Sequence, residues 1–163
     1  MIALGAVALL SLTASCVPDV DDLESEVSRV CVRGVAMPFP GSSGGTTTSR
    51  LDIAALDLDL DKLEPGATMA LESLEMAPGV GVEDLAFADR IAMGLISRNS
   101  GTTELVAVES VGTANPVHAD GDPDLDILPI LRDAQAQLEM TVSGEVPGNP
   151  WAAAVDVCLA VQE

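Results

Sequence analysis

The chain has 163 residues, of which 48% are hydrophobic and only 2% aromatic, so it suits one folded domain with a mainly aliphatic core. Its 26 acidic and 7 basic residues give a net charge of −19. A surface of that sign repels phosphate groups, which argues against a nucleic-acid partner and against docking on anionic lipid headgroups.

The first fifteen residues have the pattern of a cleavable export signal. An uncharged apolar run over 1–12 is short for a membrane-spanning helix and is followed at once by a polar segment. The segment Leu-Thr-Ala-Ser-Cys over 12–16 resembles the lipobox of bacterial lipoproteins. The resemblance implies that 1–15 are removed and that diacylglycerol is attached to the thiol of Cys16. An ordinary secretory signal and an uncleaved anchor helix are the alternatives.

The residues that follow Cys16 predict a tether and a location. In the lipoproteins that the segment resembles, an aspartate directly after the cysteine favours retention at the inner membrane. Val17 stands there in this chain, so the resemblance favours the outer membrane, with the acyl chains as the membrane contact. Residues 16–27 carry five carboxylates and are expected to form an acidic tether ahead of a domain over 28–163.

Apolar and polar residues alternate along much of this domain, which is the period of half-buried strands. The expected strands cover 28–39, 56–61, 68–76, 91–95, 103–111, 136–143 and 155–161. The apolar face of 68–76 switches between Leu71 and Leu74, which predicts a β-bulge. Residues 99–101 form a hairpin turn, and 103–111 is apolar on both faces and is therefore expected to be a central strand.

The remaining segments are expected to be loops and short helical turns. The glycine- and serine-rich stretch 41–49 and the stretch 113–124 have loop composition, 83–87 suits one helical turn, and Asp126 could cap a short helix that contains Pro129. We therefore predict an all-β domain, an antiparallel β-sandwich of immunoglobulin-like type with about seven or eight strands. The alternative is an α+β domain with a helix over 125–138.

Cys31 and Cys158 stand in the first and last expected strands, and an exported protein folds where disulfides persist. Each cysteine lies on the polar face of its strand, which favours a disulfide between neighbouring strands over one through the core. An antiparallel register with the two cysteines opposite each other also sets Arg33 opposite Asp156, so a cross-strand ion pair is expected. Two free buried thiols are the alternative.

Four aspartates alternate in a turn-rich loop and are the candidate metal ligands: Asp120, Asp122, Asp124 and Asp126. Carboxylates two residues apart can converge on a calcium ion, which takes six or more oxygen ligands. The order of an EF-hand is not met, because Pro123 interrupts the loop and no glutamate closes it. Solvated loop carboxylates are the alternative, and calcium is the only cofactor that the sequence suggests.

Catalytic patterns are scarce. His118 is the only histidine, no G-x-S-x-G segment occurs, and the stretch 41–49 lacks the lysine of a phosphate-binding loop. Tyrosine is absent and Trp151 is the only tryptophan, so sugar-stacking platforms are few. The sequence therefore favours a non-catalytic binding or structural module of the cell envelope, with an envelope protein or a glycan as partner. A calcium-stabilised adhesion module and an envelope hydrolase are the alternatives.

Overall fold

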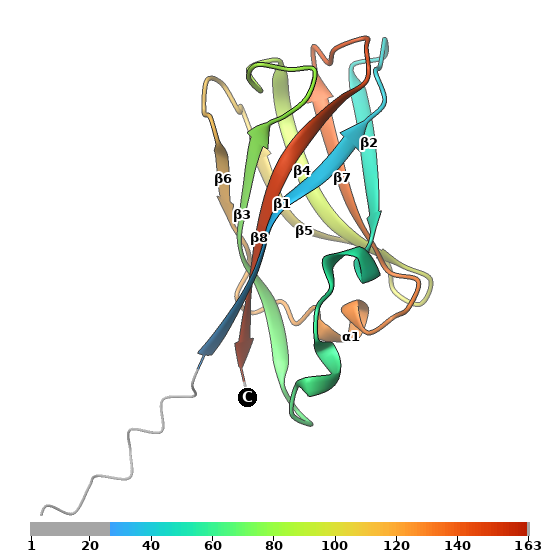
Figure 1. Ribbon diagram of the computed structural model, residues 1–163, viewed down its shortest axis with the longest axis vertical. Coiled ribbons are helices and arrows are strands. Elements are labelled where there is room, and N and C mark those ends of the chain that lie inside the picture. The colour runs from blue at the N-terminus through green and yellow to red at the C-terminus, as the bar shows by residue number, and fades with distance from the viewer. Residues whose placement is uncertain (1–26, 163) are drawn as a thin grey trace, which may run out of the picture.

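The computed structural model describes residues 27–162, which form two antiparallel sheets packed face to face (Figure 1). The strands are β1 (Val27–Phe39), β2 (Thr46–Asp52), β3 (Thr68–Pro78), β4 (Ala88–Ser97), β5 (Gly101–Glu109), β6 (Val117–Asp120), β7 (Gln137–Gly144) and β8 (Trp151–Gln162). One sheet has the order β1-β8-β3-β6 and the other β2-β7-β4-β5. The predicted β-sandwich is confirmed.

The strand order is that of a jelly roll. Successive strands alternate between the two sheets, and within the described residues only β4 and β5 are both consecutive and paired as a hairpin. An immunoglobulin sandwich instead pairs consecutive strands several times within its sheets, so the predicted type of sandwich is corrected. The α+β alternative is also excluded, because the α-helix within 125–138 is the single turn α1 (Leu128–Leu131).

The core lies between the sheets and consists of the inward-facing side chains of the strands. In β7, Leu138, Met140 and Val142 are buried while the residues between them are half-buried on the outer side, as the alternation predicts. The register of β3 against β8 shifts between Leu71 and Ser73, which confirms the predicted bulge. Across residues 27–162, no helix has the length and apolar character needed to cross a bilayer.

Segment 56–61 is not the expected strand. It falls in and around two 3₁₀ turns, η1 (Ile53–Leu56) and η2 (Leu60–Lys62), with Asp57 in the left-handed conformation at a φ of 50°. Its leucines still pack against the core, but they do so from a winding connection. A 3₁₀ turn repeats every three residues, so the alternation of leucine and aspartate comes from the irregular residues 57–59 that join the two turns.

Two strands lie where loops were expected. Thr46 to Ser49 belong to β2, where Thr48 and Thr46 pair through their hydroxyls with Thr141 and Ser143 of β7, each at 3.2 Å. β6 lies within the expected loop 113–124 and pairs with β3. Both strands are at sheet edges, where one partner suffices and strong strand-forming composition is not required.

β5 is an edge strand rather than a central one. Its apolar character on both faces follows from a bulge, because the register against β4 shifts between Met93 and Gly94. Leu105 and Val106, which are consecutive, therefore both pack against the core. Residues 83–87 form bends and a turn closed by the Ala88 amide on the Leu85 carbonyl, at 3.0 Å, instead of the expected helical turn.

The sandwich has two ends that differ in structure. The start of β1, the turns η1, η2 and α1, and the β4–β5 turn lie at one end, which we call the helical end (Figure 1). The opposite end carries the connections 40–45, 79–87, 110–116 and 145–150, and we call it the loop end. The two ends therefore present different surfaces to the surroundings.

All three aromatic residues of the chain meet at the loop end. Phe39 and Trp151 are cross-strand partners whose rings stack with centroids 4.2 Å apart, and Phe87 packs edge-on to Trp151 at 5.2 Å. Phe39 and Trp151 are 1% and 3% exposed, whereas Phe87 is half-buried. This cluster fixes the loop end to the aliphatic core, since aromatic pairs add to the free energy of area burial.

Phe39→Ala is expected to lower the free energy of unfolding by about 3–5 kcal/mol, because it empties a fully buried site beside Trp151. Phe87→Ala removes a half-buried ring and should cost less than half as much. Urea denaturation followed by the emission of Trp151, the single tryptophan, measures both. A loss below about 1 kcal/mol for Phe39→Ala would contradict the assigned packing.

Candidate functional site

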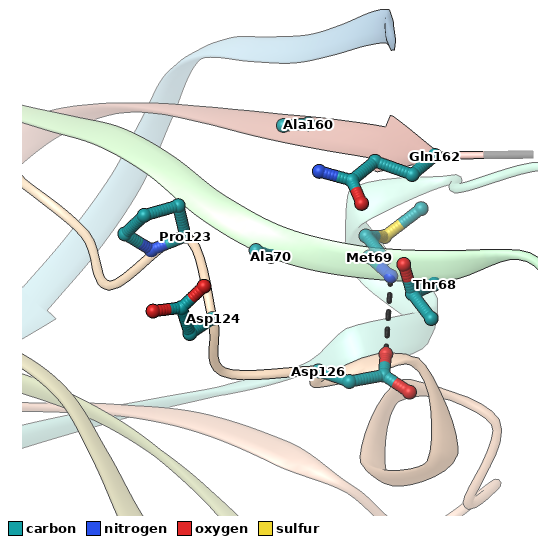
Figure 2. Close-up of a pocket in the computed structure, with 8 residues that line it drawn as sticks. All are labelled: Thr68, Met69, Ala70, Pro123, Asp124, Asp126, Ala160 and Gln162. Carbon is teal, nitrogen blue, oxygen red and sulfur yellow. Dashed lines mark hydrogen bonds between the residues drawn. The ribbon is translucent and has the colours of Figure 1, made fainter. Parts of the chain in front are cut away.

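The loop that carries the predicted metal ligands lies at the helical end, between β6 and α1 (Figure 1). Asp126 is committed to the backbone there. Its Oδ1 accepts hydrogen bonds from the amides of Met69 and Leu128, at 3.0 and 3.1 Å, and the bond from Met69 is drawn in Figure 2. Asp126 thereby joins the start of β3 to α1. It lies one residue before Ile127, the N-cap of α1, so it is not the predicted helix cap, although Pro129 does lie in the first turn.

The other three aspartates are held separately. Oδ1 of Asp122 accepts a hydrogen bond from the amide of Asp124 at 2.9 Å, and Asp120 lies 3.1 Å from Nε2 of His118. Among residues 27–162, no three histidine, cysteine, aspartate or glutamate side chains are grouped so that they could share an ion. The four aspartates therefore do not converge on one point, contrary to the prediction that they share a calcium ion.

A hollow of about 260 Å³ opens beside this loop. The residues that line it, shown in Figure 2, come from three separate segments of the chain: Thr68, Met69, Ala70, Pro123, Asp124, Asp126, Ala160 and Gln162. Asp124 is the one carboxylate of this lining that the structure leaves uncommitted to a backbone amide. Sequence reasoning found the two aspartates and missed Thr68 and Gln162, because strand pairing alone brings the ends of β3 and β8 to the loop.

His118 is 56% exposed on β6, and its imidazole contacts Asp120 alone among the polar side chains of the described residues. No serine or cysteine in that part of the chain is hydrogen-bonded to it. A nucleophile and a base would have to lie within hydrogen-bond reach of each other. The arrangement around His118 therefore offers no activated nucleophile.

The predicted disulfide is present. Cys31 and Cys158 are bonded, with Cα atoms 4.1 Å apart, and they stand directly opposite in the antiparallel register of β1 and β8. A disulfide between the first and last strands indicates a protein that folds outside the cytoplasm.

The predicted ion pair between Arg33 and Asp156 is wrong. The register shifts between Val32 and Val35, so Arg33 and Gly34 form a bulge and have no single partner on β8. Oδ1 of Asp156 instead accepts a hydrogen bond from the amide of Gly34 at 2.7 Å, and Gly34 has a φ of +65° that glycine adopts without strain. The bulge withdraws Arg33 from the position that an unbroken ladder would give it.

The outer face of the second sheet carries a shallow hollow of about 140 Å³ over Gly94. Glu139 and Glu104 are the cross-strand neighbours of Gly94 on either side. Glu139 pairs with Nε of Arg50 at 2.7 Å, and Glu104 with Nη2 of Arg90 at the same distance. Nε of Arg90 also pairs with Glu109 at 2.6 Å, so three carboxylates share two arginines, and the lining of the hollow contains no aromatic ring.

A wider hollow, of about 620 Å³, opens at the helical end beside Ser97, Arg98 and Gln135. Asp133 lies next to it, and the amide of Gln135 donates to its Oδ1 at 3.0 Å. This hydrogen bond lowers the pKa of Asp133 below its ordinary value, helped by the Ser97 hydroxyl and by the amide and charge of Arg98. The Asp133 carboxylate thus stabilises the turn over 133–136.

No protein-family model matches the chain, and no curated protein matches it. Among solved structures it is similar to CBM32-3 from a family 31 glycoside hydrolase of Clostridium perfringens, at 13% identity over 76% of this chain and 75% of that one, with a TM-score of 0.38.

Two further solved structures are similar at the same level. The arabinose-bound α-L-arabinofuranosidase MgGH51 matches at 12% identity over 74% of this chain and 18% of its own, with a TM-score of 0.34. The extra small virus particle of the prawn Macrobrachium rosenbergii matches at 14% over 99% and 94%, with a TM-score of 0.29. At these identities and TM-scores the comparisons assign no function to the chain.

Asp126→Ala is expected to lower the free energy of unfolding by about 1–3 kcal/mol, because two amide donors lose a charged acceptor. Asp124→Ala is the matched control, since it changes the same hollow and breaks no hydrogen bond of the Asp124 carboxylate; it should stay within ~0.5 kcal/mol. Chemical denaturation at neutral pH measures both. Equal effects would show that Asp126 is a surface carboxylate like its neighbour.

The lowered pKa of Asp133 predicts a pH dependence. Its carboxylate stabilises the fold at pH values above the pKa of the unfolded chain, and this contribution is lost as the pH falls through the folded-state pKa. Asp133→Asn should therefore be less stable than wild type at pH 6, and the difference should shrink toward pH 2. Urea midpoints across this range test the prediction, and a constant difference would refute it.

Proposed function

We propose that the chain is an exported lipoprotein whose sandwich is a non-catalytic binding domain, held at a membrane by diacylglycerol on Cys16. Cys16 and the predicted signal lie outside the described residues. The observation that carries the proposal is the position of β1, which begins at the helical end and is bonded to the last strand through Cys31 and Cys158. A fold outside the cytoplasm whose first strand begins at one end of the sandwich suits a domain that is attached through the residues ahead of that strand.

The polarity of the sandwich supports the same proposal. Ten residues, 17–26, separate Cys16 from β1, and a fully extended stretch of that length spans at most about 35 Å. A lipid on Cys16 would thus face the helical end, and the loop end would point toward the next layer of the envelope. Val17 favours the outer membrane as the site of attachment.

The charges divide between the two ends in a way that fits this orientation. Exposed carboxylates gather at the helical end: Asp57, Asp59, Asp61, Glu64, Asp122 and Asp124. Anionic lipid headgroups repel them, so this end stands off the membrane instead of lying on it. The four connections of the loop end contain three charged residues, Glu83, Asp84 and Glu145, and are the surface that we assign to a partner.

A binding role is favoured over catalysis by the side chains themselves. His118 has no activated nucleophile beside it, and the hollows beside Asp124 and beside Ser97 are open and lined by carboxylates, amides and hydroxyls. Trp151 and Phe39 are buried, so they present no ring face for a sugar. An envelope protein is therefore the partner that we favour, ahead of a glycan.

The proposal predicts that Cys16→Ser abolishes lipid attachment and membrane association of the full-length chain. Incorporation of a palmitate analogue, intact mass and detergent-phase partition measure this in cells. Cys31→Ser with Cys158→Ser is the matched control, because it removes the other two cysteines of the chain and should leave the lipid in place. A mature protein that begins elsewhere than at Cys16, or that carries no acyl chain, would overturn the proposal.

A further inference from the structure

The strand next to the predicted tether, β1, is weakly supported at its outer end. β1 is at the edge of the sheet, so β8 is its only hydrogen-bonded neighbour. The first part of β1 is also poorly covered: Arg29 and Val30 are exposed, whereas Met37 and Phe39 near its far end are fully buried. The ion pair of Arg29 with Glu72, at 2.7 Å, is itself exposed and adds little.

The ladder between β1 and β8 is interrupted as well. Its register breaks between Val32 and Val35, where Gly34 is held through the side chain of Asp156 in place of a regular backbone partner. A force applied at Val27 would meet six residue pairs, then this bulge, and only afterwards the well-packed half of the strand. An edge strand so divided resists extraction poorly, because its hydrogen bonds are not loaded together.

The disulfide stands ahead of the bulge, where it shields the bulge from such a force. Cys31 follows the first four residues of β1, and one further pair, Val32 with Val157, lies between it and the register break. Its partner Cys158 lies on β8, a central strand that pairs with β1 on one side and β3 on the other. The covalent bond therefore passes tension from an edge strand with one neighbour to a strand with two.

We infer that the Cys31–Cys158 bond is a mechanical clamp, which lets the domain be held by its amino-terminal tether without β1 being drawn out of the sheet. This role rests on the proposed lipid anchor, since it presumes that tension arrives through the residues ahead of β1. Tension then runs through Cys158 along β8 toward Trp151 at the loop end, where we place the partner. With the clamp, extraction of β1 requires β8 to move with it and so to slide against β3.

The test pulls on single molecules of the full-length chain carrying Cys16→Ser, so no lipid is involved. One handle is at the amino terminus, and the other is on an azide-bearing residue in place of Val80, which is 82% exposed at the loop end. The oxidised chain should rupture in one step. After reduction, or with Cys31→Ala and Cys158→Ala, the thirteen residues of β1 should detach first, at a lower force than the rest of the domain.

A second pulling direction separates the clamp from ordinary stabilisation. With the first handle moved to the carboxyl terminus, tension enters β8 directly, and loss of the bond should leave the rupture force unchanged. The clamp is refuted if the force from the amino terminus does not fall, or if it falls equally in both directions. A missing lipid in cells would instead overturn the anchor and leave these forces as measured.

Discussion

The structure depends on the pairing of the first strand with the last. β8 lies inside its sheet between β1 and β3, and its inward residues Val155, Val157, Leu159 and Val161 are all buried. A strand in that position holds a neighbouring strand on each side, yet it is the last strand in the sequence. The bond from Cys31 to Cys158 closes 127 residues into a loop, which restricts the unfolded chain and favours this late pairing by about 4–5 kcal/mol in the chain-entropy account.

Features that depend on neighbouring residues could be predicted from the sequence. The alternation in β7 places Leu138, Met140 and Val142 inward, and the change of face between Leu71 and Leu74 corresponds to a real bulge. The facing cysteines were also predictable, because both lie on the polar side of terminal strands. In each case a period of two fixes which side of a strand a residue occupies, and no distant contact is needed to read it.

The order of the strands could not be predicted in this way. Whether a sandwich is a jelly roll or an immunoglobulin fold depends on which distant strands pair, and the residues of an inner face look alike in both. Edge strands were the harder cases. The sequence predicts loops over most of β2 and β6 and a central strand at β5, whereas all three are edge strands, because one-sided pairing relaxes the composition that marks a strand.

Two residues of the candidate site, Asp124 and Asp126, could be predicted from the sequence, but their roles could not. Asp126 was correctly placed ahead of a helical turn, but its second donor, Met69, stands 57 residues earlier in the chain. The expected pair of Arg33 and Asp156 does not form, because the amide of Gly34 takes Asp156 as its acceptor. An isolated glycine inside a strand pattern is itself a sign of a bulge. That signal was available in the sequence, whereas the long-range contact of Asp126 was not.

The bulge in β1 has one more consequence. The free edge of a sheet invites the same edge of another molecule, and proteins crowded on a surface meet edge to edge more often than proteins in solution. A kinked edge with Arg29 and Arg33 exposed beside it gives a second copy no continuous row of amides and carbonyls to match. The irregularity that disturbs the domain's own ladder thus also discourages neighbouring molecules from aggregating along it.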